Sequence, residues 1–321
     1  MTNDRALAAS LRGRLRIPVM AGPMFIASTA DLVIAQCKAG IIGAMPALNP
    51  RTSDELDADI ARIRRALEGC AAPFAINLVA HRTNARLDAD LAIIVKHRVP
   101  IVVLALAASA AINDAVHAYG GLVFNDVATE RHARKCADVG VDGIIAVAAG
   151  AGGHTGSVSP FALIAEIREW WDGLLILSGC IANGRAILAA EALGADLAYV
   201  GSPFLASTEA NTQEEFKRMI VESDSRDVMV TNCFTGVNAC FLRPSVVANG
   251  LDPKNLVRAE GVAISIADGG ANPKAWRDIW SAGQGIGAVK SSGPAKEYID
   301  GLVADYGRAR QAMGMPAISA P

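Results

Sequence analysis

The chain has 321 residues, of which 52% are hydrophobic and 19% charged, and its formal net charge is -2. This composition is typical of a soluble globular protein, long enough for two average domains or for one barrel of about 250 residues with insertions. No apolar run reaches the roughly 18 uncharged residues of a membrane helix, and no Lys/Arg-rich run favours nucleic acid as a partner. We therefore expect no membrane span, no cleaved signal and a cytoplasmic location.

The spacing of cysteine and histidine argues against disulfides and metal. The six cysteines include no C-x-x-C pair, and the five histidines include no pair with zinc-ligand spacing. Reduced thiols without a dedicated metal site fit this pattern. The G-x-S-x-G elbow of serine hydrolases and the phosphate loop of nucleotide triphosphatases are also missing from the sequence.

Short apolar runs alternate with Ala-rich amphipathic stretches over the first two hundred residues. The runs predict strands at Ile17–Ala21, Ile41–Met45, Phe74–Leu78, Ile101–Leu104, Leu122–Asn125, Gly143–Val147, Leu174–Ser178 and Leu197–Val200. They are continuously apolar, as parallel strands covered on both faces should be. Eight such strands with intervening helices predict an α/β protein with a closed (β/α)8 TIM barrel, and an open doubly wound sheet is the alternative.

Helix signals agree with this pattern. Thr52 and the polar and acidic residues after it open a helix toward Leu67, and Ser159-Pro160 opens another helix toward Trp170. From about residue 206 to residue 280 the regular alternation of apolar runs and amphipathic stretches stops, and the sequence has a mixed character. We expect residues 1–205 and 281–321 to form the barrel, and residues 206–280 to form an insertion or lid over its mouth that lines the substrate site.

The residues that directly follow the strands are the candidate active-site residues, because the active face of such a barrel lies at the C-terminal strand ends. Small residues follow the last two strands, at Ser178-Gly179-Cys180 and Gly201-Ser202. Backbone amides there, next to helix starts, are where barrels hold phosphate. The sequence thus predicts a phosphate-bearing cofactor, although ordinary strand-to-helix turns would look the same.

The segment from Ala148 to Pro160, AAGAGGHTGSVSP, places His154 in a glycine-dense turn after a predicted strand. Glycines let a ligand approach the backbone closely, and a histidine changes charge near neutral pH. His154 is therefore a candidate for proton transfer or for holding an anionic substrate. The alternative is a surface loop whose histidine has no role.

Five segments together resemble the nitronate monooxygenase family, formerly called 2-nitropropane dioxygenases. They are Ala21-Gly22-Pro23-Met24, the Gly150–Gly156 loop, Leu177–Cys180, Gly194–Asp196 before Gly201-Ser202, and Trp280–Gly285. The glycine loop and the A-G-x-M start are shared with flavin-dependent enoyl-thioester reductases and quinone reductases. The resemblance implies FMN more firmly than it implies a nitronate.

The resemblance also implies roles for individual residues. Ala21, Gly22, Pro23 and Met24 would line the flavin ring, Asn77 would bond to it, and Gln284 and Gly285 would close over it. The phosphate would lie on Ser178, Gly179, Cys180, Gly201 and Ser202. Gly152, Gly153 and Asn125 complete the expected cofactor site, with His154 catalytic beside the flavin. Some relatives carry a basic side chain where the fifth predicted strand here ends in neutral Asn125, and this difference could change the redox tuning of the cofactor.

The implied activity is oxidation of a small alkyl nitronate, such as propionate 3-nitronate, or of a nitroalkane, with O2 to a carbonyl compound and nitrite. His154 would either steady the anionic nitronate or remove the α-proton of a neutral nitroalkane. The alternative is a reductase in which NAD(P)H reduces FMN and the flavin then reduces a quinone or an enoyl thioester. A homo-oligomer is compatible with either activity.

Overall fold

The computed structural model describes residues 4–256 and 274–316. Its main sheet has eight parallel strands in the order β1-β9-β8-β6-β5-β4-β3-β2. A parallel bridge between Met20 and Ile42 joins the two ends of this order, so the sheet closes on itself. The predicted (β/α)8 barrel is confirmed, and the open doubly wound sheet is excluded by this closure.

The predicted strands are confirmed, with small shifts at their ends. The barrel strands are β1 (Val19–Ala21), β2 (Gly43–Pro46), β3 (Phe74–Val79), β4 (Ile101–Ala105), β5 (Leu122–Val127), β6 (Gly143–Val147), β8 (Leu174–Ser178) and β9 (Leu197–Val200). Their residues are almost all buried because side chains fill the barrel on one face and helices cover the other. β1 and β2 begin two residues later than predicted, and β5 continues two residues beyond the predicted end at Asn125.

The outer layer is formed by α1 (Asp4–Arg12), α2 (Ala30–Lys38), α3 (Ser53–Ala66), α4 (Leu87–Lys96), α5 (Ala110–His117), α6 (Glu130–Asp138), α7 (Pro160–Arg168), α8 (Gly184–Leu193) and α11 (Ala295–Ala312). Several of these helices begin at a side-chain cap. The Thr52 hydroxyl accepts from the Glu55 N–H, and the Asn183 amide oxygen accepts from the Ala186 N–H. Such caps stabilise a helix by about 1 kcal/mol each. None of the helices in the described ranges is both long and apolar enough to cross a membrane.

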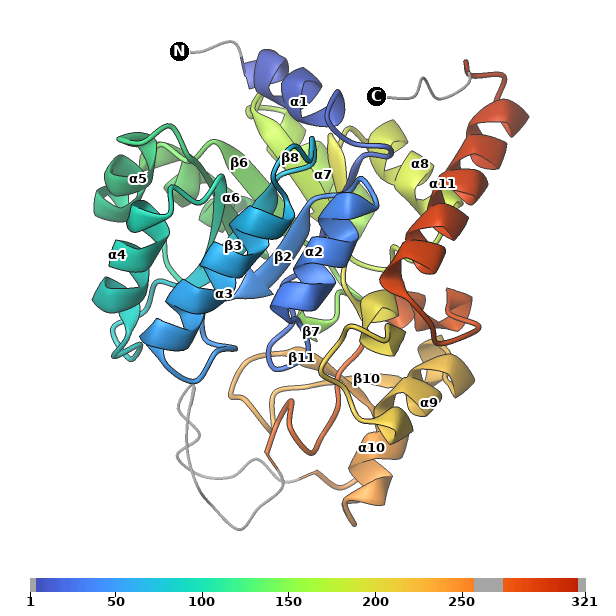
Figure 1. Cartoon of the computed structure of the whole chain (residues 1–321). Helices are drawn as coiled ribbons and strands as arrows, with labels where there is room; N and C mark the ends of the chain where they lie inside the picture. Colours follow the sequence, from blue (N-terminus) through green and yellow to red (C-terminus); the bar gives the residue numbers. More distant parts are fainter. Residues whose placement is uncertain (1–3, 257–273, 317–321) are drawn as a thin grey trace.

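The remaining elements gather at one end of the barrel, opposite α1 (Figure 1). They are β7 (Gly153–His154), η1 (Ser202–Ala206), α9 (Glu214–Glu222), η2 (Ser225–Asp227), β10 (Val228–Thr231), β11 (Ala239–Leu242), α10 (Arg243–Ala248) and η3 (Gln284–Ala288). A second sheet has the order β10-β11-β7. Most of these elements fall within residues 206–280, which we call the excursion segment. Its residues 257–273 lie outside the described residues.

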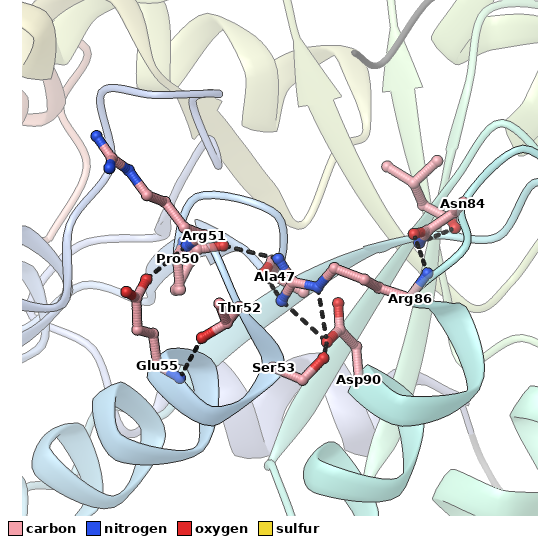
Figure 2. A network of polar contacts seen from close by, with 10 residues as sticks. Ala47, Pro50, Arg51, Thr52, Ser53, Glu55, Asn84, Arg86 and Asp90 are labelled. Carbon is pink, nitrogen blue, oxygen red and sulfur yellow. Dashed lines mark hydrogen bonds and ion pairs between the residues drawn. The ribbon is translucent and has the colours of Figure 1, made fainter. Parts of the chain in front are cut away.

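A buried ion pair ties together two loops at this end of the barrel (Figure 2). Arg86 donates to the carbonyl oxygens of Pro50 and Ala47 at 2.7 and 3.2 Å, and its Nη2 lies 2.9 Å from Oδ1 of Asp90. Ser53 donates to the same carboxyl oxygen at 2.7 Å. The Asp90 side chain is fully buried. The loops after β2 and β3 are therefore held together, next to the cavity described below.

Candidate active site

A cavity of about 580 Å³ lies between the C-terminal strand ends and the excursion segment. This is the face on which barrels of this class place their active sites. Most residues selected from the sequence line it, namely Gly22, Pro23, Met24, Asn77, Gly152, Gly153, His154, Ser178, Gly179, Cys180, Gly201, Ser202 and Gly285. The fold thus brings together residues from six separate parts of the chain.

Three other selected residues do not line the cavity. Ala21 is fully buried and donates its N–H to Ile42. The Asn125 side chain donates to the carbonyl oxygens of Leu104 and Ala107, both at 3.2 Å. Gln284 donates its N–H to the Gly150 carbonyl oxygen at 2.9 Å. The structure places these three as supports of the loops that line the cavity.

The ends of β8 and β9 carry free backbone donors. No hydrogen bond within the described ranges uses the N–H of Gly179, Cys180, Gly201 or Ser202. Gly179 and Cys180 both have positive φ, +134° and +58°. Consecutive amides in such turns, close to a helix start, form a concave site for an anion. The donor set therefore fits the phosphate of a cofactor.

The loop after β6 packs tightly against these strand ends. A Cβ at Gly152 would come within 2.9 Å of Ser202 Oγ and of the Gly283 N. A Cβ at Gly150, whose φ is +83°, would lie 2.4 Å from Cys180 Sγ. The Gly283 N–H donates to Ser202 Oγ at 2.7 Å, which leaves the Ser202 hydroxyl hydrogen free for a ligand. Glycines are required here because three backbone segments meet.

His154 is positioned by the excursion segment. It lies on β7, where it pairs in register with Ala239 of β11. The preceding Gly153 N–H donates to Ser281 Oγ at 2.9 Å, and Ser281 donates to the Cys240 carbonyl oxygen. The predicted glycine turn is thus partly a strand. Sequence analysis missed this pairing because its partner lies in a distant, mixed segment.

The His154 ring lines the cavity and packs edge-on against Trp276, with ring centroids 5.5 Å apart. No described side chain or backbone group forms a hydrogen bond with its ring nitrogens. Much of the ring is open to the cavity, yet the surrounding atoms desolvate it and lower its pKa below the usual 6.5. A neutral imidazole with a free nitrogen results, as a general base requires.

Strained backbone is concentrated around the cavity. Within the described ranges, five residues other than glycine have positive φ, and four of them line the cavity: Ile26, Leu106, Cys180 and Trp276. Such conformations cost of order 1–3 kcal/mol each and persist only where the surrounding structure enforces them. Their clustering supports a functional role for the cavity.

The cavity also contains residues that sequence reasoning had not selected. Asp126 and Tyr199 lie at the strand ends, and the aromatic rings of Phe216, Trp276 and Trp280 lie on the side of the excursion segment. Asp126 directly follows Asn125 on β5, so its position at a strand end was the available signal. The aromatic residues carry no local signal of their position.

The model of the family described as nitronate monooxygenase matches residues 79–305. The chain belongs to the nitronate monooxygenase family. The resemblance seen in the sequence is confirmed. The strand ends from β3 to β9 and the His154 loop all fall within the matched region.

Relatives named for two activities match the chain. The nitronate monooxygenase of Neurospora crassa is 36% identical over 121 residues, covering 35% of this chain and 32% of that enzyme. A 5-hydroxy-7a-methyl-1-oxo-octahydro-1H-indene-4-carboxyl-CoA dehydrogenase of Mycobacterium tuberculosis is 27% identical over 256 residues, covering 79% and 70% of the two chains. The chain spans about a third of the length of the monooxygenases that it matches.

Similarity to a solved structure extends over the whole barrel. A nitroalkane oxidase from Streptomyces ansochromogenes superposes with a TM-score of 0.78 at 24% identity, covering 95% of this chain and 99% of that one. At this identity the match supports the fold.

Proposed function

We propose that this protein is an FMN-dependent nitronate monooxygenase, which converts alkyl nitronates such as propionate 3-nitronate with O2 into a carbonyl compound and nitrite. The observation that carries the proposal is the shared cavity. A histidine without a hydrogen-bond partner among the described residues faces the same space as the free amides of the β8 and β9 ends. A base and an anion site are thus combined in one cavity.

The residues present fit FMN. The amides of Gly179, Cys180, Gly201 and Ser202 would hold its phosphate, and Asn77 with Gly22, Pro23 and Met24 would line its ring. FMN, when bound, supplies the electron-accepting ring. We assign cofactor binding to residues 1–205 and 281–321 and substrate selection to the excursion segment.

His154 would act on the substrate. As a neutral imidazole it can take the α-proton of a nitroalkane on its free ring nitrogen, or donate a hydrogen bond to a nitro oxygen of a nitronate. Trp276 limits the orientation of the ring through their edge-to-face contact. The aromatic rings Phe216 and Trp280, stacked 4.8 Å apart, shield the same space from water.

His154→Asn tests this role. Nitrite formation from a nitroalkane should fall by about 10²-fold or more, because positioned proton transfer contributes at least that much. FMN content should be unchanged. His132→Asn, at an exposed position on α6, is the matched control and should keep full activity. Equal nitrite rates in the two variants would contradict the assignment.

A second candidate is flavin-dependent oxidation or reduction of an acyl thioester with a pyridine nucleotide. It is favoured by the coverage of the carboxyl-CoA dehydrogenase alignment, 79% of the chain, against 35% for the fungal monooxygenase. Anaerobic stopped-flow mixing distinguishes the two candidates. Flavin bleaching by propionate 3-nitronate, with nitrite once O2 is admitted, supports the first, and bleaching only by NADH or NADPH supports the second.

A further inference from the structure

Two buried polar atoms at the bottom of the cavity have no partner among the described residues. They are Oδ1 of Asp126 and the hydroxyl oxygen of Tyr199, and both residues line the cavity. Buried polar atoms in folded proteins are hydrogen-bonded in the large majority of cases. Because these two atoms belong to residues of one cavity, the polar groups of a ligand in that cavity can supply their missing partners.

The barrel topology directs both side chains into the same space. Asp126 lies on β5 and Tyr199 on β9, with β6 and β8 between these strands in the sheet order. Asp126 shares its register with Ile145 of β6, and Tyr199 with Ser178 of β8. Both residues line the cavity, so the two side chains reach the same space from strands that are separated by β6 and β8. Burial raises the pKa of the Tyr199 hydroxyl well above its usual value, and the charge of Asp126 raises it further.

The charges around Asp126 leave its carboxyl without a cation. Among the described lining residues, only His154 and Arg277 carry or can gain positive charge, and Arg277 donates to Asp278. Burial raises the pKa of Asp126 to about 7. Below that pH the carboxyl is mostly uncharged, and it can then donate a hydrogen bond as well as accept one.

We propose that Asp126 and Tyr199 form a donor–acceptor pair that binds the polar edge of the flavin ring, and that this pair tunes the affinity and the reduction potential of the cofactor. This proposal rests on the proposed function. The polar edge of an isoalloxazine presents carbonyl acceptors on both sides of an N–H donor. A carboxylic acid and a phenol together supply the complementary pattern of donors and an acceptor, whereas aliphatic side chains at these positions would not. The two residues are positioning residues for the ring.

A pair of near-isosteric variants tests the proposal. Asp126→Asn keeps a neutral donor and acceptor, and FMN affinity should stay within about threefold of wild type. Asp126→Leu leaves Tyr199 and the ring edge without partners, and affinity should fall by about tenfold or more. Tyr199→Phe should weaken FMN in the same direction. Affinity is measured by fluorescence titration of the apoprotein with FMN, and circular dichroism reports whether each variant is folded.

The pH dependence gives a second readout. Wild-type FMN affinity should fall as the pH rises through about 7, because an ionised Asp126 no longer donates, and Asp126→Asn should be flat over that range. The other titratable groups near Asp126 change their charge outside this pH range. The pKa of His154 on β7 lies below 6.5, that of Cys136 on α6 is about 11 and that of Tyr199 is above 10, while Arg277 stays charged. The midpoint potential of bound FMN should be shifted in Asp126→Leu and not in Asp126→Asn.

The outcomes separate this inference from the proposed function. Absence of FMN binding to the wild-type protein would overturn both. Normal FMN binding by wild type, with unchanged affinity and potential in folded Asp126→Leu, would overturn the role of Asp126 alone. An effect of Asp126→Asn equal to that of Asp126→Leu would likewise reject the uncharged pair.

Discussion

The imidazole of His154 meets the indole of Trp276 edge to face, with centroids 5.5 Å apart and planes at 84°. Trp276 in turn stacks on Phe241, a fully buried residue of β11, at 5.1 Å. The catalytic candidate is therefore oriented by two aromatic residues that the excursion segment supplies. The position of His154 therefore depends on Trp276, which lines the same cavity, and on Phe241, which does not line it.

Removing this contact should lower turnover. In Trp276→Ala the His154 ring gains freedom to rotate, and we expect kcat for nitronate oxidation to fall by about tenfold or more, because small misplacements of a catalytic group are costly. FMN content should be unaffected. Trp280→Ala is the control, since Trp280 lines the same cavity but stacks on Phe216. A larger loss of kcat in the control would show that His154 does not depend on Trp276.

The protonation of His154 predicts a pH profile that depends on the substrate. Burial lowers the pKa of His154, so the neutral form persists below pH 6.5 and is lost only at lower pH. With a neutral nitroalkane, kcat/KM should decline on the acid side below pH 6.5, because protonation removes the base. With a preformed nitronate this decline should be weaker. Identical acid limbs for both substrates, or a limb above pH 6.5, would contradict the base role.

Gly150 should tolerate no side chain. Gly150→Ala combines a φ of +83° with a Cβ only 2.4 Å from Cys180 Sγ, so we expect the loop to shift and FMN affinity to fall by about tenfold or more. Gly140→Ala is a matched control, because its φ is +80° and a Cβ there meets no atom within 4 Å. That variant should lose about 1 kcal/mol of stability from backbone strain alone and keep its FMN affinity. Fluorescence titration and thermal unfolding measure the two effects.

The Arg86–Asp90 pair should contribute strongly to stability. Arg86→Ala leaves the fully buried Asp90 carboxyl without its cation, and the free energy of unfolding should fall by about 3–5 kcal/mol. Arg226→Ala removes an exposed pair with Asp224 and should lower the free energy of unfolding far less, because solvent screens that pair. Denaturant unfolding of both variants provides the comparison. Equal losses would show that burial does not set the strength of the Arg86 pair.

Local patterns predicted the barrel because each strand and helix carries its own signal. The bounds of β6, β8 and β9 agree with the apolar runs at Gly143–Val147, Leu174–Ser178 and Leu197–Val200. The cap at Thr52 likewise starts α3 where the polar residues predicted it. These features depend on residues that are close together in the sequence, so they can be predicted from the sequence alone.

The local pattern did not predict which side chains of β5 point into the cavity. The predicted strand stopped at Asn125, whereas β5 continues to Val127. Side chains alternate along a strand, so the strand end alone does not say whether Asn125 or Asp126 faces the cavity. Pairing with β4 and β6 decides it, and places Asp126 in the cavity and Asn125 against the Leu104 and Ala107 carbonyl oxygens.

The sequence by itself determined the eight strands, the glycine-rich ends of β8 and β9 and the choice of His154, because these follow from local composition and from the resemblance of short motifs. Only the tertiary structure decided that His154 pairs with Ala239, that Trp276 packs on its ring, and that Asp126 and Tyr199 line the same cavity. The physical reason is that these contacts join distant segments. Their geometry depends on barrel closure and strand register, which no local window of sequence contains.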